Sequence, residues 1–114
     1  MMGTCSSLPV LYVAVGRRLG YPLKLVSTKE HLFARWEDTR NHLNMEGTSH
    51  GFISENDDYY KTWPCSVSDE EIKTNNYLKA MTAKEELACF MATRGACLMV
   101  MNQARGEGSR LFCR

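Results

Sequence analysis

The stretch HLFARWEDTRNHLNME, residues 31–46, decides the fold of this chain. Residues 31–36 are predicted to form a strand that puts the even-numbered side chains on one face and the odd-numbered ones on the other. Residues 38–41 are turn formers, and residues 42–46 return as the next strand. Because residues 23–27 alternate between apolar and polar side chains, they are expected to add a further strand before these two.

A helix is predicted before this three-strand meander. Between Leu8 and Leu19 the apolar residues recur with the three- and four-residue spacing of a helix that has one apolar face. Gly20 and Pro22 supply the signals that end it. Pro9 has no amide proton and is therefore expected to distort the first turn.

The C-terminal half is predicted to be helical. A short helical turn is expected at residues 57–63, after a loop rich in Gly, Ser, Asn and Asp. Two capping boxes follow, one at residues 68–71 and one at residues 82–85, and each is typical of a helix start. The first of these helices is expected to run to about Ala80, and from Gln103 onward the glycines and charges indicate a frayed tail.

Length and composition limit the class of protein. The chain of 114 residues suits a single α+β domain over residues 1–114, with an N-terminal helix, a small antiparallel sheet and a helical C-terminal part at residues 66–103. A net charge of +1 gives no electrostatic footprint for nucleic acid. No apolar run approaches the roughly 18 residues of a membrane span, and no signal peptide precedes the first helix, so we expect a cytoplasmic protein.

One of the five cysteines has a setting that would activate it. Cys5 lies at the start of the first predicted helix, where free amides and the helix dipole lower the pKa of a thiol. The other four are expected to be structural or incidental, since a free cysteine is often a small buried hydrophobe: Cys65, Cys89, Cys97 and Cys113. No Cys-x-x-Cys pair is present, which argues against a structural zinc site.

A histidine and an acid complete the parts of a cysteine nucleophile system. His31 begins one predicted strand and Glu46 ends the next, so an antiparallel pairing brings them close together. An imidazole can take the proton of Cys5 as general base and return it to the leaving amine, and a carboxylate can fix its tautomer. The alternative is that Cys5 is structural, His31 a solvated or core histidine and Glu46 a turn carboxylate.

The order of these segments resembles the core of the transglutaminase-like superfamily. The matching segments are residues 3–8 leading into residues 17–22, then residues 31–36, then residues 44–49. The resemblance covers residues 3–52 and is closest to bacterial transglutaminase-like proteins of unassigned activity.

This resemblance implies a papain-like α+β fold, with Cys5 as nucleophile, His31 as base and Glu46 in the orienting position. Family members include transglutaminases, peptidases and amidases, so it implies reaction at an amide or peptide bond through an acyl-thioester. The partner would then be a peptide or protein amide substrate.

The chain departs from the family pattern in two places. The orienting residue is usually Asp, and here it is Glu46, with Asn44 a weaker candidate on the same strand face. Only four residues precede Cys5, whereas papain-like enzymes draw an oxyanion-hole side chain from an upstream segment. A catalytically inactive binding or assembly domain is therefore the alternative function, and self-association or a missing flanking segment stays open.

The candidate substrate-binding residues are aromatic or lie on the loop after Glu46. They are Trp36, His50, Tyr59 and Tyr60, with Trp63 beside them. The alternative places Trp36 in the core under a lid formed by residues 57–63 and leaves His50 a solvated loop histidine. A metal site has no ligand-pair spacing behind it, so neither a metal nor a cofactor is expected.

Overall fold

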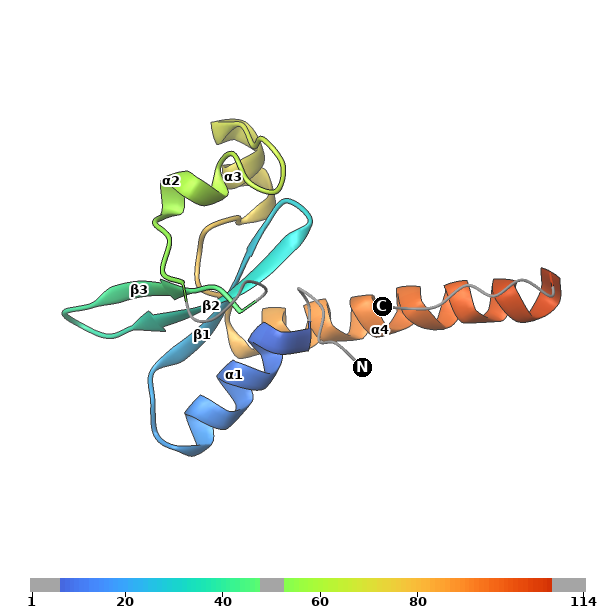
Figure 1. The fold of residues 1–114 in the computed structure, drawn as a ribbon, viewed down its shortest axis with the longest axis horizontal. Coiled ribbons are helices and arrows are strands. Elements are labelled where there is room, and N and C mark those ends of the chain that lie inside the picture. Colours follow the sequence, from blue (N-terminus) through green and yellow to red (C-terminus); the bar gives the residue numbers. More distant parts are fainter. Residues whose placement is uncertain (1–6, 48–52, 108–114) are drawn as a thin grey trace. The chain divides into compact units, whose positions relative to one another are not determined.

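The computed structural model describes residues 7–47 and 53–107, and it is a small α+β protein with a three-strand antiparallel sheet and several helices (Figure 1). The elements follow the order predicted for a helix, a meander and further helices. They are α1 (Ser7–Arg18), β1 (Leu23–Thr28), β2 (His31–Glu37), β3 (His42–Met45), α2 (Asp57–Tyr60), α3 (Asp69–Asn75) and α4 (Ala83–Glu107).

The sheet is the predicted meander, in the order β1-β2-β3. β1 pairs with β2 from Leu23 opposite Trp36 to Thr28 opposite His31. β2 pairs with β3 so that Arg35 lies opposite Asn44. The predicted turn between β2 and β3 is held by Asp38, whose carboxylate accepts hydrogen bonds from two backbone amides at 2.7 Å. Because side chains alternate along each strand, this register fixes which residues share a face.

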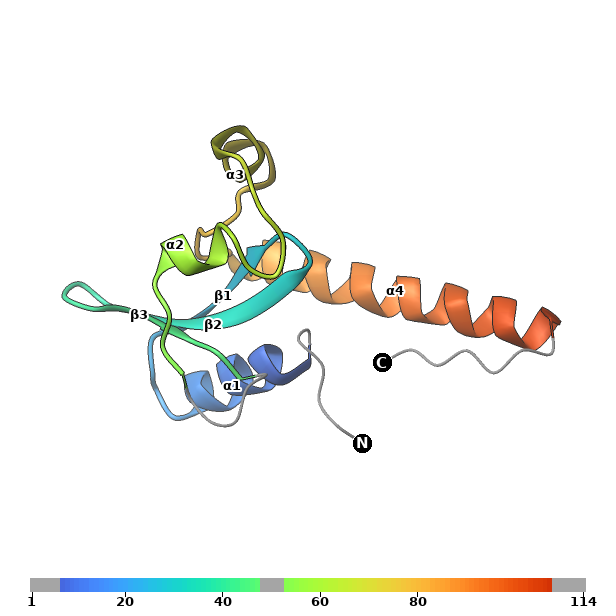
Figure 2. The same ribbon diagram turned by 45° about the horizontal axis from the view of Figure 1, so that its top comes forward.

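The two faces of the sheet are covered by different helices: α1 lies on one face and α2 on the other (Figure 2). On the α1 face a small apolar core forms around Val13, Leu23, Leu25 and Ala34. Gly16 allows close approach here, since a Cβ at this position would overlap the Leu23 side chain. Pro9 is buried within the first turn of α1, where its missing amide proton is not needed for an intrahelical bond.

Both predicted capping boxes are present. Ser68 and Glu71 cap α3 reciprocally. At the start of α4, Thr82 N–H donates to the Glu85 carboxylate at 2.7 Å, and Glu85 N–H donates to the Thr82 hydroxyl at 3.3 Å. A short polar side chain at the cap satisfies amides that have no partner in the first turn, which is why these two starts could be placed from sequence.

Two helix ends differ from the prediction. The helix expected to reach about Ala80 ends at Asn75, because Asn76 adopts a left-handed conformation and the chain turns back to the sheet. There Leu78 N–H donates to the Ser27 carbonyl and Met81 N–H to the Leu25 carbonyl, each at 2.9 Å. The tail expected from Gln103 is helical as far as Glu107, where α4 ends, and the rest of it lies outside the described residues.

The chain divides into two compact units, Met1–Met81 and Thr82–Arg114. The helical part expected at residues 66–103 is therefore shared between them. α4, in the second unit, has many exposed apolar side chains along its length: Leu87, Phe90, Met91, Leu98, Met99, Val100 and Met101. Among the described residues, no helix combines the length and the apolar character needed to cross a membrane.

Candidate active site

His31 and Glu46 meet inside the first unit. His31 Nε2 lies 2.7 Å from Glu46 Oε2, a hydrogen bond between two buried side chains. His31 is 5% exposed and Glu46 is 4% exposed. A carboxylate and an imidazole this close attract each other strongly, because little water separates or screens them.

The strand register explains why they meet. With Ala34 opposite Met45, the next residue pair along the sheet places Glu46 across from Phe33. His31 is two residues before Phe33 and therefore points to the same face. Beyond β3, Glu46 N–H donates to the Ile53 carbonyl at 2.9 Å, which holds the backbone of the acid in place.

Aromatic rings surround the imidazole. Trp63 presents its ring in a T-shaped arrangement 4.8 Å from the His31 ring. Tyr60 lies 6.1 Å from His31 in a stacked arrangement, and its ring also contacts Phe33 at 3.9 Å and Tyr59 at 5.2 Å. These rings remove water from the His31–Glu46 pair and so strengthen its hydrogen bond.

The carboxylate of Glu46 has donors on both oxygens. Tyr60 donates its hydroxyl to Oε2 at 3.2 Å, and Gly47 N–H donates to Oε1 at 3.0 Å. Burial raises the pKa of the Tyr60 phenol, and the adjacent Glu46 raises it further. Tyr60 therefore stays protonated and acts as a donor across the ordinary pH range.

The hydrogen bond to Glu46 has a consequence for the other imidazole nitrogen. When Glu46 is ionised its carboxylate can only accept, and in that state Nε2 of His31 is the protonated nitrogen. In the neutral ring, Nδ1 then holds a lone pair and can accept a proton. This is the tautomer that a base toward a thiol requires.

The N-terminal end of α1 lies toward this end of the sheet. Its Gly16 lies against Leu23, at the end of the sheet where β1 begins. One turn earlier in α1, the ring of Tyr12 lies where a Cβ on Gly47 would be, next to Glu46. Followed from Gly16 toward its N-terminus, α1 therefore approaches the end of the sheet where Glu46 lies. Ser7 begins the helix five residues before Tyr12, about 7.5 Å along the axis at roughly 1.5 Å per residue.

A second polar cluster lies farther along the same face. The guanidinium of Arg35 is buried and donates to Asn44 Oδ1 at 2.7 Å, to Asp57 Oδ1 at 2.7 Å and to the Leu78 carbonyl at 3.0 Å. Burial lowers the pKa of Arg35, and the charge of Asp57 opposes this shift. The cluster fixes α2, which begins at Asp57, to the sheet.

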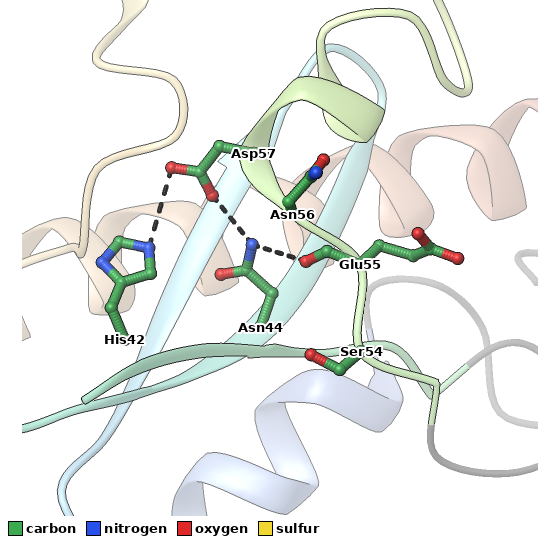
Figure 3. A pocket seen from close by; sticks show the side chains of 6 residues that line it. All are labelled: His42, Asn44, Ser54, Glu55, Asn56 and Asp57. Carbon is green, nitrogen blue, oxygen red and sulfur yellow. Dashed lines mark hydrogen bonds and ion pairs between the residues drawn. The ribbon is translucent and has the colours of Figure 1, made fainter.

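A pocket of about 480 Å³ opens at the exposed edge of this cluster. It is lined by His42, Asn44, Ser54, Glu55, Asn56 and Asp57. Figure 3 shows Asn44 at its base, donating to Asp57 and to the Glu55 carbonyl, while the Glu55 carboxylate points away from both. Asp57 Oδ2 also faces His42 Nε2 at 3.7 Å. The lining offers polar contacts to a ligand but holds no imidazole–carboxylate hydrogen bond like that of His31.

The structure brings together some of the predicted site residues. His31 and Glu46 are in direct contact, whereas Cys5 and His50 lie outside the described residues. Trp36 is on the opposite face of β2 from His31, where it packs near Tyr21 at 5.4 Å. Asn44, the weaker candidate for the orienting position, instead accepts a hydrogen bond from Arg35 and donates one to Asp57.

The aromatic candidates on α2 have different environments. Tyr59 is half-buried and stacks with Trp63 at 5.4 Å, so these two rings remain available to line a substrate site. Tyr60 is fully buried, which leaves it no surface for a substrate. Its hydroxyl instead contacts Glu46, a role that sequence reasoning missed; the only signal was its place in the same short helix as Tyr59.

Within residues 7–47 and 53–107 no group of three or more potential ligand side chains is placed to hold a metal ion. Comparison with known proteins gave no match: neither a protein-family model, nor a curated protein, nor a solved structure matches this chain. Function is therefore inferred from the residues of the site.

Proposed function

We propose that this protein is a cysteine-dependent amide or peptide-bond hydrolase or acyltransferase with a transglutaminase-like, papain-type site. Cys5 is the nucleophile, His31 the base and Glu46 the residue that orients His31. The proposal rests on one observation above all, the buried hydrogen bond from His31 Nε2 to Glu46 Oε2. It leaves Nδ1 as the nitrogen that would face a thiol.

The direction and composition of α1 support the placement of the nucleophile. Cys5 is two residues before Ser7, the first residue of α1, and the N-terminal end of α1 lies toward the Glu46 end of the sheet, on the face opposite to the His31 and Glu46 side chains. The first turn of α1 has no acidic residue, and Arg17 and Arg18 are in the last turn. An anion near the helix start is therefore stabilised by the helix dipole and meets no carboxylate within that turn.

The reaction follows from these roles. The Cys5 sulfur attacks the amide carbonyl carbon, and its proton passes to His31 Nδ1. His31 then gives this proton to the leaving amine as the C–N bond breaks, which leaves an acyl-thioester on Cys5. Water attacks the thioester with His31 again as base, releasing the acid and restoring the thiol. We place hydrolysis before transfer to an amine, because the sequence indicates no dedicated acceptor site.

The test is the pH dependence of Cys5 alkylation by iodoacetamide, mapped by mass spectrometry in the wild type and in His31→Ala. We expect Cys5 to react well below the ordinary thiol pKa of about 8.5, and His31→Ala to shift the profile upward by about one unit or more. Cys65, a free and partly exposed thiol, is the internal control. His42→Ala is the matched variant, since His42 is an exposed histidine on β3.

Substrate screening with peptide and amide libraries follows if Cys5 behaves in this way. If Cys5 instead titrates like Cys65 and neither histidine variant changes its profile, the catalytic proposal fails. The same result with an unchanged circular dichroism spectrum excludes misfolding as the cause.

The exposed apolar side chains of α4 favour a second candidate function, a catalytically inactive binding or assembly domain. Phe90, Met91 and Met99 are each at least half exposed, although their side chains are large and apolar. Sedimentation velocity across a range of protein concentrations tests this function. Self-association together with an unreactive Cys5 would support it over the catalytic one, and a monomer with a reactive Cys5 would exclude it.

A further inference from the structure

Glu46 receives two donors on the same carboxylate oxygen. His31 Nε2 lies 2.7 Å from Oε2 and the Tyr60 hydroxyl lies 3.2 Å from it. A glutamate has one more rotatable bond than an aspartate and loses more side-chain freedom when it is fixed. Contacts that fix both oxygens reduce the number of orientations that Glu46 can adopt beside His31.

Tyr60 is itself held from several sides. Its ring stacks on Phe33 at 3.9 Å, and its backbone carbonyl accepts a hydrogen bond from the Thr28 hydroxyl at 2.8 Å. Three residues earlier, at the start of α2, Asp57 is bound to the buried guanidinium of Arg35. The hydroxyl of Tyr60 is therefore fixed by contacts to β1 and β2, which are independent of its bond to Glu46.

We propose that Tyr60 is the positioning residue of the site: its hydroxyl fixes the Glu46 carboxylate against His31 and stabilises the ionised form of that carboxylate. This inference rests on the proposed function for its meaning in catalysis. Tyr60 acts only through Glu46, because its ring is completely buried and touches no surface that a substrate could reach.

A donor on a carboxylate has a predictable effect on the pair to which the carboxylate belongs. His31 and Glu46 together bind a proton as one coupled unit. The Tyr60 hydroxyl stabilises the unprotonated pair, in which Glu46 is an anion beside a neutral imidazole, more than it stabilises the protonated pair. Without the hydroxyl, the pair binds its proton more tightly, whichever of the two residues receives it.

The experiment follows the ring proton signals of His31 by NMR as the pH is changed. In Tyr60→Phe, which keeps the stacked ring, we expect the midpoint of the His31 titration to rise by about one pH unit. Tyr59→Phe is the matched control, because it removes a phenol hydroxyl from the same helix and leaves the Glu46 contact intact. Tyr12, whose ring lies beside Gly47, and Arg35, farther along the same face as the pair, stay unchanged in every variant.

A second background distinguishes a direct contact from a general packing effect. In Glu46→Gln the carboxylate is absent, so adding Tyr60→Phe should leave the His31 midpoint where Glu46→Gln has placed it. A shift of equal size in both backgrounds, or no shift in Tyr60→Phe with native Glu46, overturns the proposal.

A measurement on the wild type keeps the test valid if a variant does not fold. The hydroxyl proton of Tyr60 and the Nε2 proton of His31 point to the same oxygen, so they should show a nuclear Overhauser contact and slow solvent exchange. Absence of this contact in a folded wild-type protein also overturns the proposal. If these signals respond as expected but His31→Ala leaves Cys5 alkylation unchanged, the positioning contact stands and the proposed function fails.

Discussion

Both faces of the sheet contain buried side chains, but they are stabilised in different ways. The face under α1 is packed with aliphatic side chains such as Val13, Leu25 and Ala34. The face under α2 includes every buried polar side chain described for the sheet: Thr28, His31, Arg35, Asn44 and Glu46. One small sheet thus has an apolar core on one side and, on the other, a hydrogen-bonded network beside the apolar cluster of Val26, Phe33 and Tyr60.

The difference shows which face needs a functional explanation. Apolar packing follows from the hydrophobic effect and tolerates changes of shape. Buried charges cost free energy unless each has partners, and replacing them by apolar residues is often neutral or stabilising. Among the described residues, every buried side-chain nitrogen and oxygen has a hydrogen-bond partner. A face organised in this way is expected where the positions of polar groups matter for chemistry.

The largest expected effect is on the polar face. Arg35→Met keeps the side-chain volume but leaves Asn44, Asp57 and the Leu78 carbonyl without their shared donor. We expect a loss of about 3 kcal/mol in the free energy of unfolding, because removing one partner leaves buried polar groups unpaired. Urea unfolding followed by tryptophan fluorescence measures this loss in the first unit, since Trp36 and Trp63 both belong to it.

The control for Arg35→Met is Lys29→Met, which breaks an exposed ion pair with Glu71. An exposed ion pair contributes little to stability because water and salt screen it, so this variant should unfold close to the wild type. Equal losses for the two variants would mean that the Arg35 cluster contributes no more than a surface contact.

A smaller effect is expected on the apolar face. In Gly16→Ala the new methyl group overlaps the buried Leu23 side chain, which must change rotamer or push α1 away from the sheet. Overpacking costs about 1–3 kcal/mol, and the better helix propensity of alanine returns at most about 1 kcal/mol of this. We therefore expect a net loss of about 1–2 kcal/mol in the same urea experiment.

Gly95→Ala is the matched helix substitution. A Cβ at Gly95 meets no atom within 4 Å, so only the gain in helix propensity remains. The tryptophan unfolding curve should then be unchanged. A stabilised Gly16→Ala variant would show that α1 can shift without cost, and that the apolar face is loosely packed.

The comparison of the two faces also shows what the sequence could predict. The contact between His31 and Glu46 was expected because a short turn sets the register of β2 and β3, and register sets the faces. The starts of α3 and α4 were expected because a capping box is a local signal. Each of these features depends on residues close together in the chain.

The missed features depend on residues far apart. The Arg35 guanidinium is buried only because Asp57, 22 residues later, returns to meet it. The Tyr60 hydroxyl reaches Glu46 only because α2 is fixed to the sheet by that same cluster. Helix α3 ends at Asn75 because the chain turns back to hydrogen-bond with β1, although helix propensity alone would favour a longer helix. In each case tertiary contacts decided between local alternatives.

The smallest expected effect is at the hairpin tip, where neither face is buried. Asp38 accepts hydrogen bonds from the Trp36 indole N–H and from the backbone amides of Arg40 and Asn41. These bonds, the one from Trp36 most of all, lower the pKa of the Asp38 carboxyl to about 2. Because this pKa is depressed, the hydrogen bonds are complete above the ordinary pKa of about 4 and are lost as the pH falls through about 2. The Trp36 indole N–H signal should therefore shift in NMR spectra with a midpoint near pH 2.

Two comparisons assign this shift to Asp38. In Asp38→Asn the side chain still accepts a hydrogen bond but no longer titrates, so the shift of the Trp36 signal should disappear. The Trp63 indole signal reports on the polar face in the same spectra, and circular dichroism marks the pH at which the fold itself is lost. If the Trp36 signal instead moves near pH 4, the hydrogen bonds of the turn do not stabilise the Asp38 carboxylate. The tip of the β2–β3 hairpin then does not contribute to the register that places Glu46 beside His31.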